Sequence, residues 1–376
     1  MKPAPAAPAP RRGATSIVTP TGPCDVPGAP DVVDVVALGE SMVTFLPSRP
    51  GRLADVPSFE RGIGGAESNV ACVLAAAGHS VRWVSAVGAD GFGDHLVEEI
   101  GSYGVDVASV RRDRARSTGI YFRTAGDRAT DAHEVAYYRA GSAASAMSTD
   151  TVDLAAARAA RVLHLSGITA ALSGSCLDLL WELTGPGPQR PLVSFDINHR
   201  PGLWTDPDGP RVLLDLARRA DLVFVGSDEA LDAWGLHGAS AVRDALPEPE
   251  LVVVKMGPGG AVALGKDPGD AEDADGTATR ARAPRVDVVA AVGAGDAFAA
   301  GFLSATLRGL PVRDRLRHGH LMAAAALTVP GDLATPPARE HADRLAALDD
   351  AAWGRLRLGP GWTEGTQRAA EEVRTP

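Results

Sequence analysis

The stretch Val292-Gly293-Ala294-Gly295-Asp296-Ala297-Phe298-Ala299-Ala300-Gly301 decides the fold of this chain. Its glycines permit a tight turn and a close backbone approach, and the small apolar residues after them predict a helix. The free N–H groups and the positive dipole end of such a helix suit phosphate oxygens. Asp296 is a candidate catalytic base, because a carboxylate at the helix start can accept a hydroxyl proton. Gly293, Ala294 and Gly295 are candidates for the phosphate-binding turn. The alternative is a plain helix start with Asp296 as its N-cap.

Short apolar runs alternate with helical stretches on the N-terminal side of this motif. The runs lie at residues 32–38, 81–87, 162–165, 192–195, 222–225 and 251–254. Repeated strand–helix units predict an α/β fold with a mostly parallel sheet that helices cover on both faces. Residues 117–140 are rich in Thr, Tyr, Phe, Val and Arg, and with residues 43–63 they are predicted to form a small separate sheet.

The two ends of the chain differ from this pattern. Residues 1–30 are rich in Ala and Pro without periodicity, which predicts a disordered tail. We expect residues 31–340 to form the folded domain, with small-sheet strands within 43–63 and 110–140. Residues 341–376 are charged and irregular, and we expect a partly disordered C-terminal tail.

The composition excludes several classes of function. The 376 residues carry a net charge of −10, which argues against a general nucleic-acid binder, because phosphate contacts need a basic surface. Cys24, Cys72 and Cys176 form no CxxC pair, so neither a disulfide framework nor a zinc site is indicated. We find no signal peptide and no apolar run long enough for a membrane span, and we expect a cytoplasmic protein without a membrane partner.

A second motif, near the N-terminus, supports a functional interpretation of the glycine stretch at Gly293 to Asp296. Gly64-Gly65-Ala66-Glu67-Ser68-Asn69-Val70-Ala71 resembles the N-terminal signature of the PfkB, or ribokinase-like, carbohydrate kinases, and Gly293 to Asp296 resembles their C-terminal signature. The resemblance runs from about residue 33 to about residue 337. It implies a three-layer α/β/α domain with a small β-sheet lid over the sugar. It also implies ATP with Mg²⁺ as the phosphoryl donor.

The same resemblance implies a nucleotide side of the site. The loop Lys255-Met256-Gly257-Pro258-Gly259-Gly260 is similar to the family's nucleotide loop, so Lys255, Gly257 and Gly260 are expected to bind ATP; the alternative is an ordinary glycine turn. Ser227 and His320 are two further ATP-binding candidates. Glu229 matches the acidic member of the family's Asn-x-x-Glu motif and is expected to support Mg²⁺ through water; the alternative is a surface glutamate.

Within the family the chain most resembles kinases of 2-keto-3-deoxygluconate, a sugar acid. The resemblance lies in Gly39-Glu40, Gly64 to Glu67, Tyr137 to Ala143, and Asp196 to Arg200 followed by Leu203-Trp204. Since arginine pairs strongly with carboxylate, two arginines are expected to read the acid group. The substrate-binding candidates are Gly64, Gly65, Asn69, Tyr121, Tyr138, Arg139 and Arg200. For the tyrosines the alternative is packing within the lid, and for Arg200 it is an ion pair with an acid such as Asp196.

Three positions depart from the family pattern. Ala290 replaces an aspartate that helps to hold a monovalent cation, which puts that cation in doubt. Gly226 replaces the asparagine of Asn-x-x-Glu, so Ser227 or Asp228 would have to rebuild magnesium positioning. His320 replaces an asparagine that is frequent near the adenine.

Several alternatives remain open. They are a kinase for fructose, ribose or a related keto-deoxy acid, and a non-catalytic sugar-acid sensor. A dinucleotide-binding oxidoreductase is disfavoured, because no GxGxxG follows the first strand. The apolar lid residues also predict a homodimer that forms through the lids.

Overall fold

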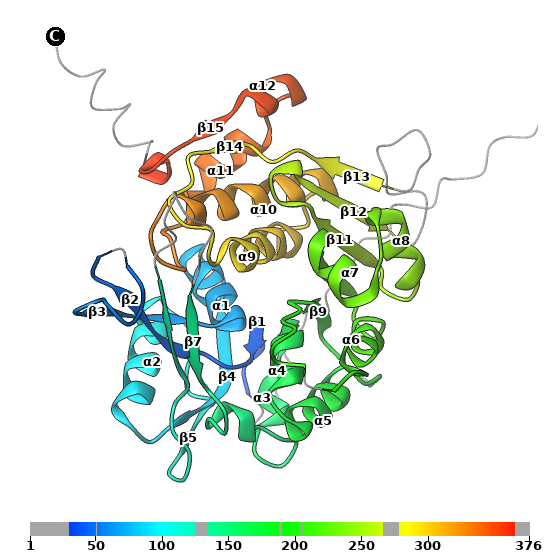
Figure 1. Ribbon diagram of the computed structural model, residues 1–376. Helices are drawn as coiled ribbons and strands as arrows, with labels where there is room; N and C mark the ends of the chain where they lie inside the picture. The colour runs from blue at the N-terminus through cyan, green and yellow to red at the C-terminus, as the bar shows by residue number, and fades with distance from the viewer. Residues whose placement is uncertain are drawn as a thin grey trace, which may run out of the picture.

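The computed structural model describes residues 30–49, 51–124, 134–187, 190–204, 206–265 and 278–364. Within these residues nine strands form one sheet in the order β13-β12-β11-β10-β9-β8-β1-β4-β5 (Figure 1). Neighbours from β10 and β11 through to β4 and β5 are parallel, whereas β12 and β13 at the other edge are antiparallel. The strands are Val33–Leu38 (β1), Val81–Gly88 (β4), Val110–Asp113 (β5), Ala160–Ser166 (β8), Leu192–Asp196 (β9), Leu222–Gly226 (β10), Leu251–Lys255 (β11), Ala261–Gly265 (β12) and Ala278–Ala281 (β13).

Helices cover both faces of this sheet, as strands that are apolar on both sides require. One face packs against Ala66–Ala76 (α1), Gly91–Ser102 (α2), Ala294–Leu307 (α9) and Val312–Leu327 (α10). The other packs against Gly167–Ala171 (α4), Gly174–Leu183 (α5), Gly209–Ala217 (α6), Ser227–Trp234 (α7) and Gly238–Ala245 (α8). Leu154–Arg158 (α3) leads into β8. The predicted three-layer α/β/α fold is confirmed.

A second sheet of four strands stands apart from the main sheet, in the order β3-β2-β6-β7. Its strands are Met42–Pro47 (β2), Phe59–Gly64 (β3), Ile120–Arg123 (β6) and Val135–Tyr138 (β7). We call this sheet the lid. The prediction of a small lid sheet is confirmed, with one correction to its limits. β5 lies within 110–140 but pairs with β4 and belongs to the main sheet.

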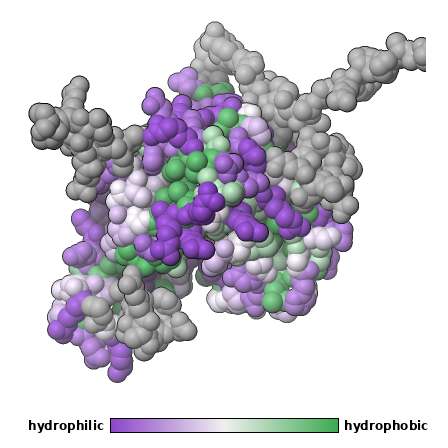
Figure 2. Space-filling view, turned by 90° about the horizontal axis from the view of Figure 1, so that it is seen from above, coloured by the Kyte–Doolittle hydropathy of each residue, from purple (hydrophilic) through white to green (hydrophobic). Residues whose placement is uncertain are grey.

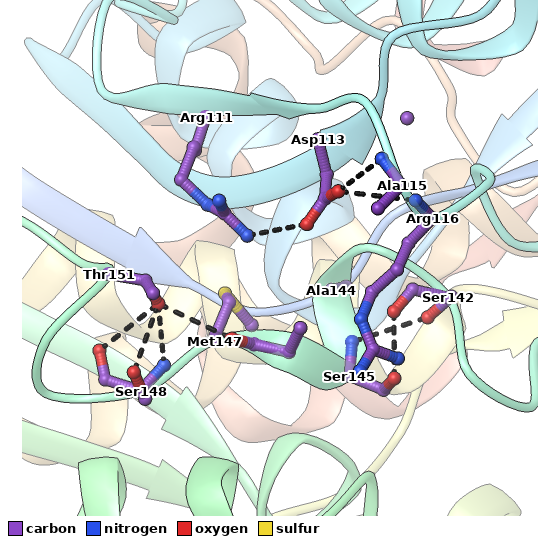
Figure 3. A network of polar contacts seen from close by, with 12 residues as sticks. Arg111, Asp113, Ala115, Arg116, Ser142, Ala144, Ser145, Met147, Ser148 and Thr151 are labelled. Atoms are coloured by element: carbon purple, nitrogen blue, oxygen red, sulfur yellow. Dashed lines mark hydrogen bonds and ion pairs between the residues drawn. The ribbon is translucent and has the colours of Figure 1, made fainter.

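The passage from β5 to the lid begins with a capped turn. Figure 3 shows that the Asp113 carboxylate accepts hydrogen bonds from the backbone N–H groups of Ala115 and Arg116, at 2.8 and 3.1 Å. The same carboxylate pairs with Arg111 at 2.7 Å. An aspartate that bonds to the backbone two and three residues ahead stabilises a turn locally. This turn ends the main-sheet strand and directs the chain toward β6.

The C-terminal part of the described chain is more regular than its composition suggests. Arg339–Ala346 (α11) and Asp350–Arg355 (α12) pack on α10 through a small apolar cluster centred on Trp353. Arg357–Leu358 (β15) pairs with Arg285–Val286 (β14). The segment that we expected to be a partly disordered tail from residue 341 thus has regular structure as far as residue 364. A few apolar side chains in a charged segment are sufficient for this when they pack against α10. The expected N-terminal tail up to residue 29 and the end from residue 365 lie outside the described residues.

The molecular surface is mixed. Seen from the side on which α12 and β15 lie, hydrophilic residues predominate, with apolar residues between them (Figure 2). Within the part of the chain that the structure describes, no helix combines the length and the apolar composition needed to cross a bilayer.

Candidate active site

A cavity of about 810 Å³ lies between the lid and the edge where the parallel strands end. Asp196 ends β9, Gly226 ends β10 and Lys255 ends β11, so three neighbouring strands end at the same place, and two of them bring charged side chains there. Ligands bind at this carboxyl edge in open α/β sheets. Among the residues proposed from sequence, the cavity is lined by Gly64, Gly65, Asn69, Tyr121, Arg139, Arg200, Glu229, Lys255, Gly293, Gly295 and Asp296.

Asp296 lies half-buried in the cavity wall, in the first turn of α9. Its Oδ2 accepts a hydrogen bond from Nδ2 of Asn69 at 2.8 Å, across 227 residues of sequence. Burial raises the pKa of Asp296 to about 7; the Asn69 bond and the ammonium of Lys255 oppose the rise, and the nearby Asp196 and Asp332 add to it. A carboxyl group with a pKa near neutrality suits a general base, which must accept and then release a proton.

Gly293 begins α9 in a conformation that favours glycine. Its φ is +74°, and a Cβ at this position would lie 2.3 Å from the carbonyl oxygen of Asp332. A side chain is therefore excluded both by backbone strain and by contact with residues after α10. The turn starts a 14-residue helix, and Gly293, Gly295 and Asp296 at this start line the cavity. The free N–H groups at a helix start are suited to anionic oxygens. Ala294 is the first residue of the helix and is not among the lining residues.

The lid contributes aromatic residues to the cavity, and strand alternation decides which ones. Tyr121 on β6 pairs with Tyr137 on β7, and the two rings lie 5.4 Å apart on the cavity side. Tyr138 points to the opposite face, where its ring packs edge-on against Phe122, and 63% of its surface is exposed. The expectation that Tyr138 faces the sugar is corrected to Tyr137, because successive strand residues face opposite sides.

The two arginines expected to read a carboxylate have different surroundings. Arg139 is almost buried and forms an ion pair with the buried Glu40, whose other oxygen accepts a hydrogen bond from Ser142 at 2.6 Å. Arg200 keeps 52% of its side chain exposed, and its only ion pair among the described residues is a long one of 3.5 Å to Glu229. Nη1 of Arg200 also donates to the carbonyl oxygen of His199 at 3.0 Å. Arg200 is nevertheless the more exposed of the two guanidinium groups. Glu40 had no role in the sequence reasoning beyond its motif.

Two further residues shape the site without having been singled out from sequence. Asp332 follows α10 and accepts hydrogen bonds from Tyr121 at 3.2 Å and from Arg123 at 2.8 Å, which ties the lid to the main domain. Asn198 has a φ of +44° in the turn after β9, a conformation that asparagine tolerates better than most residues. That turn brings Arg200 to the cavity wall. The sequence contained one indication of a special role for Asn198, because this asparagine follows a buried strand. It contained no such indication for Asp332.

Of the residues expected to bind ATP, only Lys255 lines the cavity. Ser227 is the first residue of α7, and Gly257 and Gly260 form the turn between β11 and β12; none of the three lines the cavity. His320 is buried against Phe298, and its Nε2 lies 3.1 Å from the carbonyl oxygen of Ala281. Burial lowers its pKa to about 4. Its ring is committed to the core, so the expectation that it contacts ATP is corrected.

Carboxylates at the strand ends fit a magnesium ion that arrives with a nucleotide. Asp196 is 2% exposed, and its Oδ1 has no hydrogen-bond partner within the described residues. The other oxygen, Oδ2, already pairs with Lys255 at 2.7 Å, so Oδ1 is the oxygen left to accept a further partner. Glu229 accepts a hydrogen bond from the N–H of Gly226 at 2.8 Å. Protein-bound Mg²⁺ commonly takes one or two carboxylates together with substrate phosphates. A Cβ at Gly226 would lie 2.7 Å from Oδ1 of Asp228, the end of a flexible side chain.

An aspartate beside a helix start suited to anions, at the wall of a lid-covered cavity of about 810 Å³, is the arrangement expected of a sugar kinase. Comparison with known proteins gives the family. The model of the pfkB family carbohydrate kinases matches residues 33–339. A Bacillus subtilis (strain 168) protein named 2-dehydro-3-deoxygluconokinase is 35% identical over 318 residues, covering 82% of this chain and 94% of that protein. The chain belongs to the pfkB family of carbohydrate kinases.

Two further relatives agree with this assignment. A Haloferax volcanii protein named 2-dehydro-3-deoxygalactonokinase is 31% identical over 329 residues, covering 86% of this chain and 99% of that protein. The crystal structure of a PfkB protein from Polaromonas sp. JS666 has a TM-score of 0.71 and 34% identity, covering 83% of this chain and 99% of that one. The expected carbohydrate kinase class is confirmed.

Proposed function

We propose that this kinase transfers the γ-phosphoryl group of ATP to the 6-hydroxyl of 2-keto-3-deoxygluconate. The observation that carries the proposal is that Arg200 and Asp296 line the same cavity. The side chain of Arg200 is half exposed and has only a long ion pair to Glu229. A sugar acid has a carboxylate for the arginine at one end and a hydroxyl for the base at the other. The B. subtilis relative carries the name of a kinase for this acid, since 2-dehydro-3-deoxygluconate is the same compound.

In the proposed reaction the deprotonated Asp296 accepts the proton of the 6-hydroxyl. The hydroxyl oxygen forms a bond to the γ-phosphorus, the bond from that phosphorus to the β–γ bridging oxygen breaks, and ADP leaves. Asn69 holds Oδ2 of Asp296 in place by its hydrogen bond. Proton acceptance by a positioned carboxylate contributes about 10²–10⁴-fold to such reactions.

The start of α9 stabilises the charge that develops on the transferred group. The first N–H groups of a helix have no partner within it, and in the proposed reaction those of Gly293 to Asp296 serve as preorganised donors that need no rearrangement. Lys255 adds a positive charge beside the same turn, since its Nζ lies 3.7 Å from where a Cβ of Gly295 would be. Asp196 and Glu229 are the residues that would hold the Mg²⁺ bound with ATP, which would supply positive charge to the phosphates.

Arg200 is proposed as the main carboxylate reader, with Arg139 in support. The charge of Arg139 is already matched by Glu40, so Arg139 holds the cavity wall and presents its remaining N–H groups. Loss of one partner of a charged pair costs about 2–5 kcal/mol in binding contexts. We therefore expect Arg200→Ala to raise KM for the sugar acid strongly while leaving neutral sugars almost unaffected.

The test is an ADP-release assay with a panel of acceptors. The panel contains 2-keto-3-deoxygluconate, its galactonate epimer, fructose and ribose, and the variants are Arg200→Ala and, as a matched control, Arg211→Ala, whose side chain is 78% exposed. The sugar acids should be preferred, and the preference should fall only in the Arg200 variant. A best turnover with fructose or ribose, or an equal loss for all acceptors, would contradict the proposal.

The epimeric acid is the second candidate acceptor. The H. volcanii relative is named for 2-dehydro-3-deoxygalactonate, and the epimers differ only in the orientation of one hydroxyl. The kcat/KM ratio of the two acids in the same panel separates the two substrates.

The lid supports a proposed homodimer. β3 and β7 are the edge strands of its sheet, and Val135, Tyr137 and Tyr138 on β7 are 42%, 54% and 63% exposed. An open sheet edge with exposed apolar residues is normally paired or covered, and a second lid provides both pairing and cover.

A further inference from the structure

The C-terminal part of the described chain is bonded to the segment that leads into α9. α12 and β15 lie beyond residue 339, where the match to the family model ends. β15 runs beside β14 and pairs with it in parallel (Figure 1). The backbone N–H of Arg285 donates to the carbonyl oxygen of Leu356 at 3.0 Å, and that of Asp287 donates to Leu358 at 2.9 Å. Because two strands by themselves are only marginally stable, this pairing needs support from other contacts.

Trp353 on α12 provides this support. It is 2% exposed and belongs to the apolar cluster that joins α10, α11 and β15. Its Nε1 donates to the carbonyl oxygen of Arg282 at 2.7 Å, three residues before β14 begins. The guanidinium of Arg317 on α10 lies over the Trp353 ring, 4.8 Å from its centroid, and also donates to the carbonyl oxygens of Ala346 and Leu348. Trp353 therefore connects α10 to the segment in front of β14.

The segment between β14 and α9 ends at the cavity wall. The backbone N–H groups of Val289 and Ala290 donate to the carbonyl oxygen of Leu327, at the end of α10, at 2.7 and 3.4 Å. The next three residues, 291–293, all line the cavity, and Gly293 begins the turn suited to anions. The path of the chain into this turn is thus set by the end of α10 on one side and by α12 and β15 on the other.

We propose that Trp353 is a positioning residue for phosphoryl transfer: through β15 and β14 it holds the turn at Gly293 in the form that binds the phosphates of the nucleotide. The proposal rests on the proposed phosphate-binding role of the α9 start, but not on the identity of the sugar. When Trp353 is lost, the segment before Gly293 is held less firmly and must be ordered each time a nucleotide binds, which costs conformational entropy. Nucleotide affinity and kcat should fall. The sugar KM should stay the same, because Tyr121, Tyr137 and Arg200 lie on other elements.

The experiment measures the binding of a non-hydrolysable ATP analogue, with Mg²⁺, to the whole chain by calorimetry, and then the kinetics of ADP release. Trp353→Ala should weaken analogue binding at least about ten-fold, which is equivalent to ordering about one backbone residue. Trp353→Phe keeps an aromatic ring but loses the donor to Arg282, so its affinity should lie between those of the wild type and the Ala variant. In both variants kcat should fall while the sugar KM stays at the wild-type value.

Trp181→Ala is the matched control. Trp181 lies on α5, on the other face of the sheet, and its ring also contacts an arginine, since the guanidinium of Arg219 lies 4.9 Å from the ring centroid. This variant loses the same kind of packing without touching β14 or β15. Its analogue affinity and its kcat should equal those of the wild type.

Three results would overturn the proposal: an unchanged analogue affinity in a folded Trp353→Ala, an equal loss in Trp181→Ala, or a sugar KM that rises as much as the analogue affinity falls. If circular dichroism shows that Trp353→Ala does not fold, Leu358→Ala replaces it with the same expectations, because Leu358 is 4% exposed in the same apolar cluster. A wild type that binds no analogue would overturn both this proposal and the phosphate-binding role of the α9 start. A preference for a neutral sugar would contradict the proposed acceptor alone, so the two failures are distinguishable.

Discussion

The hydrogen bond from Asn69 to Asp296 allows a direct test of the base. Asn69 Nδ2 donates to the carboxylate at 2.8 Å and opposes the burial that raises the pKa of Asp296 to about 7. Asn69→Ala removes this donor, so the pKa rises further. A hydrogen bond to a charged group contributes about 1.5–3 kcal/mol, and the open cavity favours the lower end. At about 1.4 kcal/mol for each pKa unit, the pKa should rise by about one unit.

The direction of the pH effect follows from the role of the base. Asp296 accepts a proton only when it is deprotonated, so kcat/KM falls as pH falls through its pKa. The acid limb of the profile should therefore lie near pH 7 in the wild type, where the pKa is about 7, and about one pH unit higher in the variant. The deprotonated fraction at pH 7 then drops about five-fold, and the difference closes about two units above neutrality.

The assay is ADP release over a pH series, with coupling enzymes in excess at each point. Ser68→Ala is the matched control, because Ser68 lies next to Asn69 on α1 but its hydroxyl donates to Ser41 and to the carbonyl oxygen of Gly65. Its acid limb should stay at the wild-type position. If Asn69→Ala raises the sugar KM and leaves the acid limb in place, Asn69 acts on the sugar alone and the reasoning is refuted.

Four further predictions concern the base, the lid and the cation. Asp296→Asn should lower kcat by at least about 10²-fold with sugar binding retained; near-normal turnover would contradict its role. Arg123→Leu leaves the buried Asp332 without its charged partner, with only the hydrogen bond from Tyr121, and should cost about 3–5 kcal/mol in the free energy of urea unfolding; a loss as small as that of Arg211→Ala would contradict this. Because a methyl group cannot coordinate a hard cation, activity should respond weakly to KCl against a tetraalkylammonium salt, and Ala290→Asp should strengthen the response; strong activation of the wild type would contradict this. Light scattering at micromolar concentration should show a dimer, and a monomer would rule out pairing through the lids.

Much of the fold could be predicted because its signals are local. The apolar runs at residues 32–38, 81–87 and 251–254 correspond to β1, β4 and β11, since burial on both faces leaves a continuous apolar run. The helices of the C-terminal segment could not be predicted in the same way. α11 and α12 are stable only against α10, through Trp353 and a few small residues, and that partner cannot be seen in the segment itself.

For the site, the sequence by itself determined which chemistry is present, and the tertiary structure decided which side chains meet. The pattern from Gly293 to Asp296 predicts a base at a helix start, because glycine geometry and helix dipoles are local properties. The contacts of Asn69 with Asp296, of Lys255 with Asp196 and of Glu40 with Arg139 join residues 227, 59 and 99 positions apart. The choice of Tyr137 over Tyr138 depended on lid register. Such pairings follow from strand order and packing, which bring distant segments together only when the whole chain has folded.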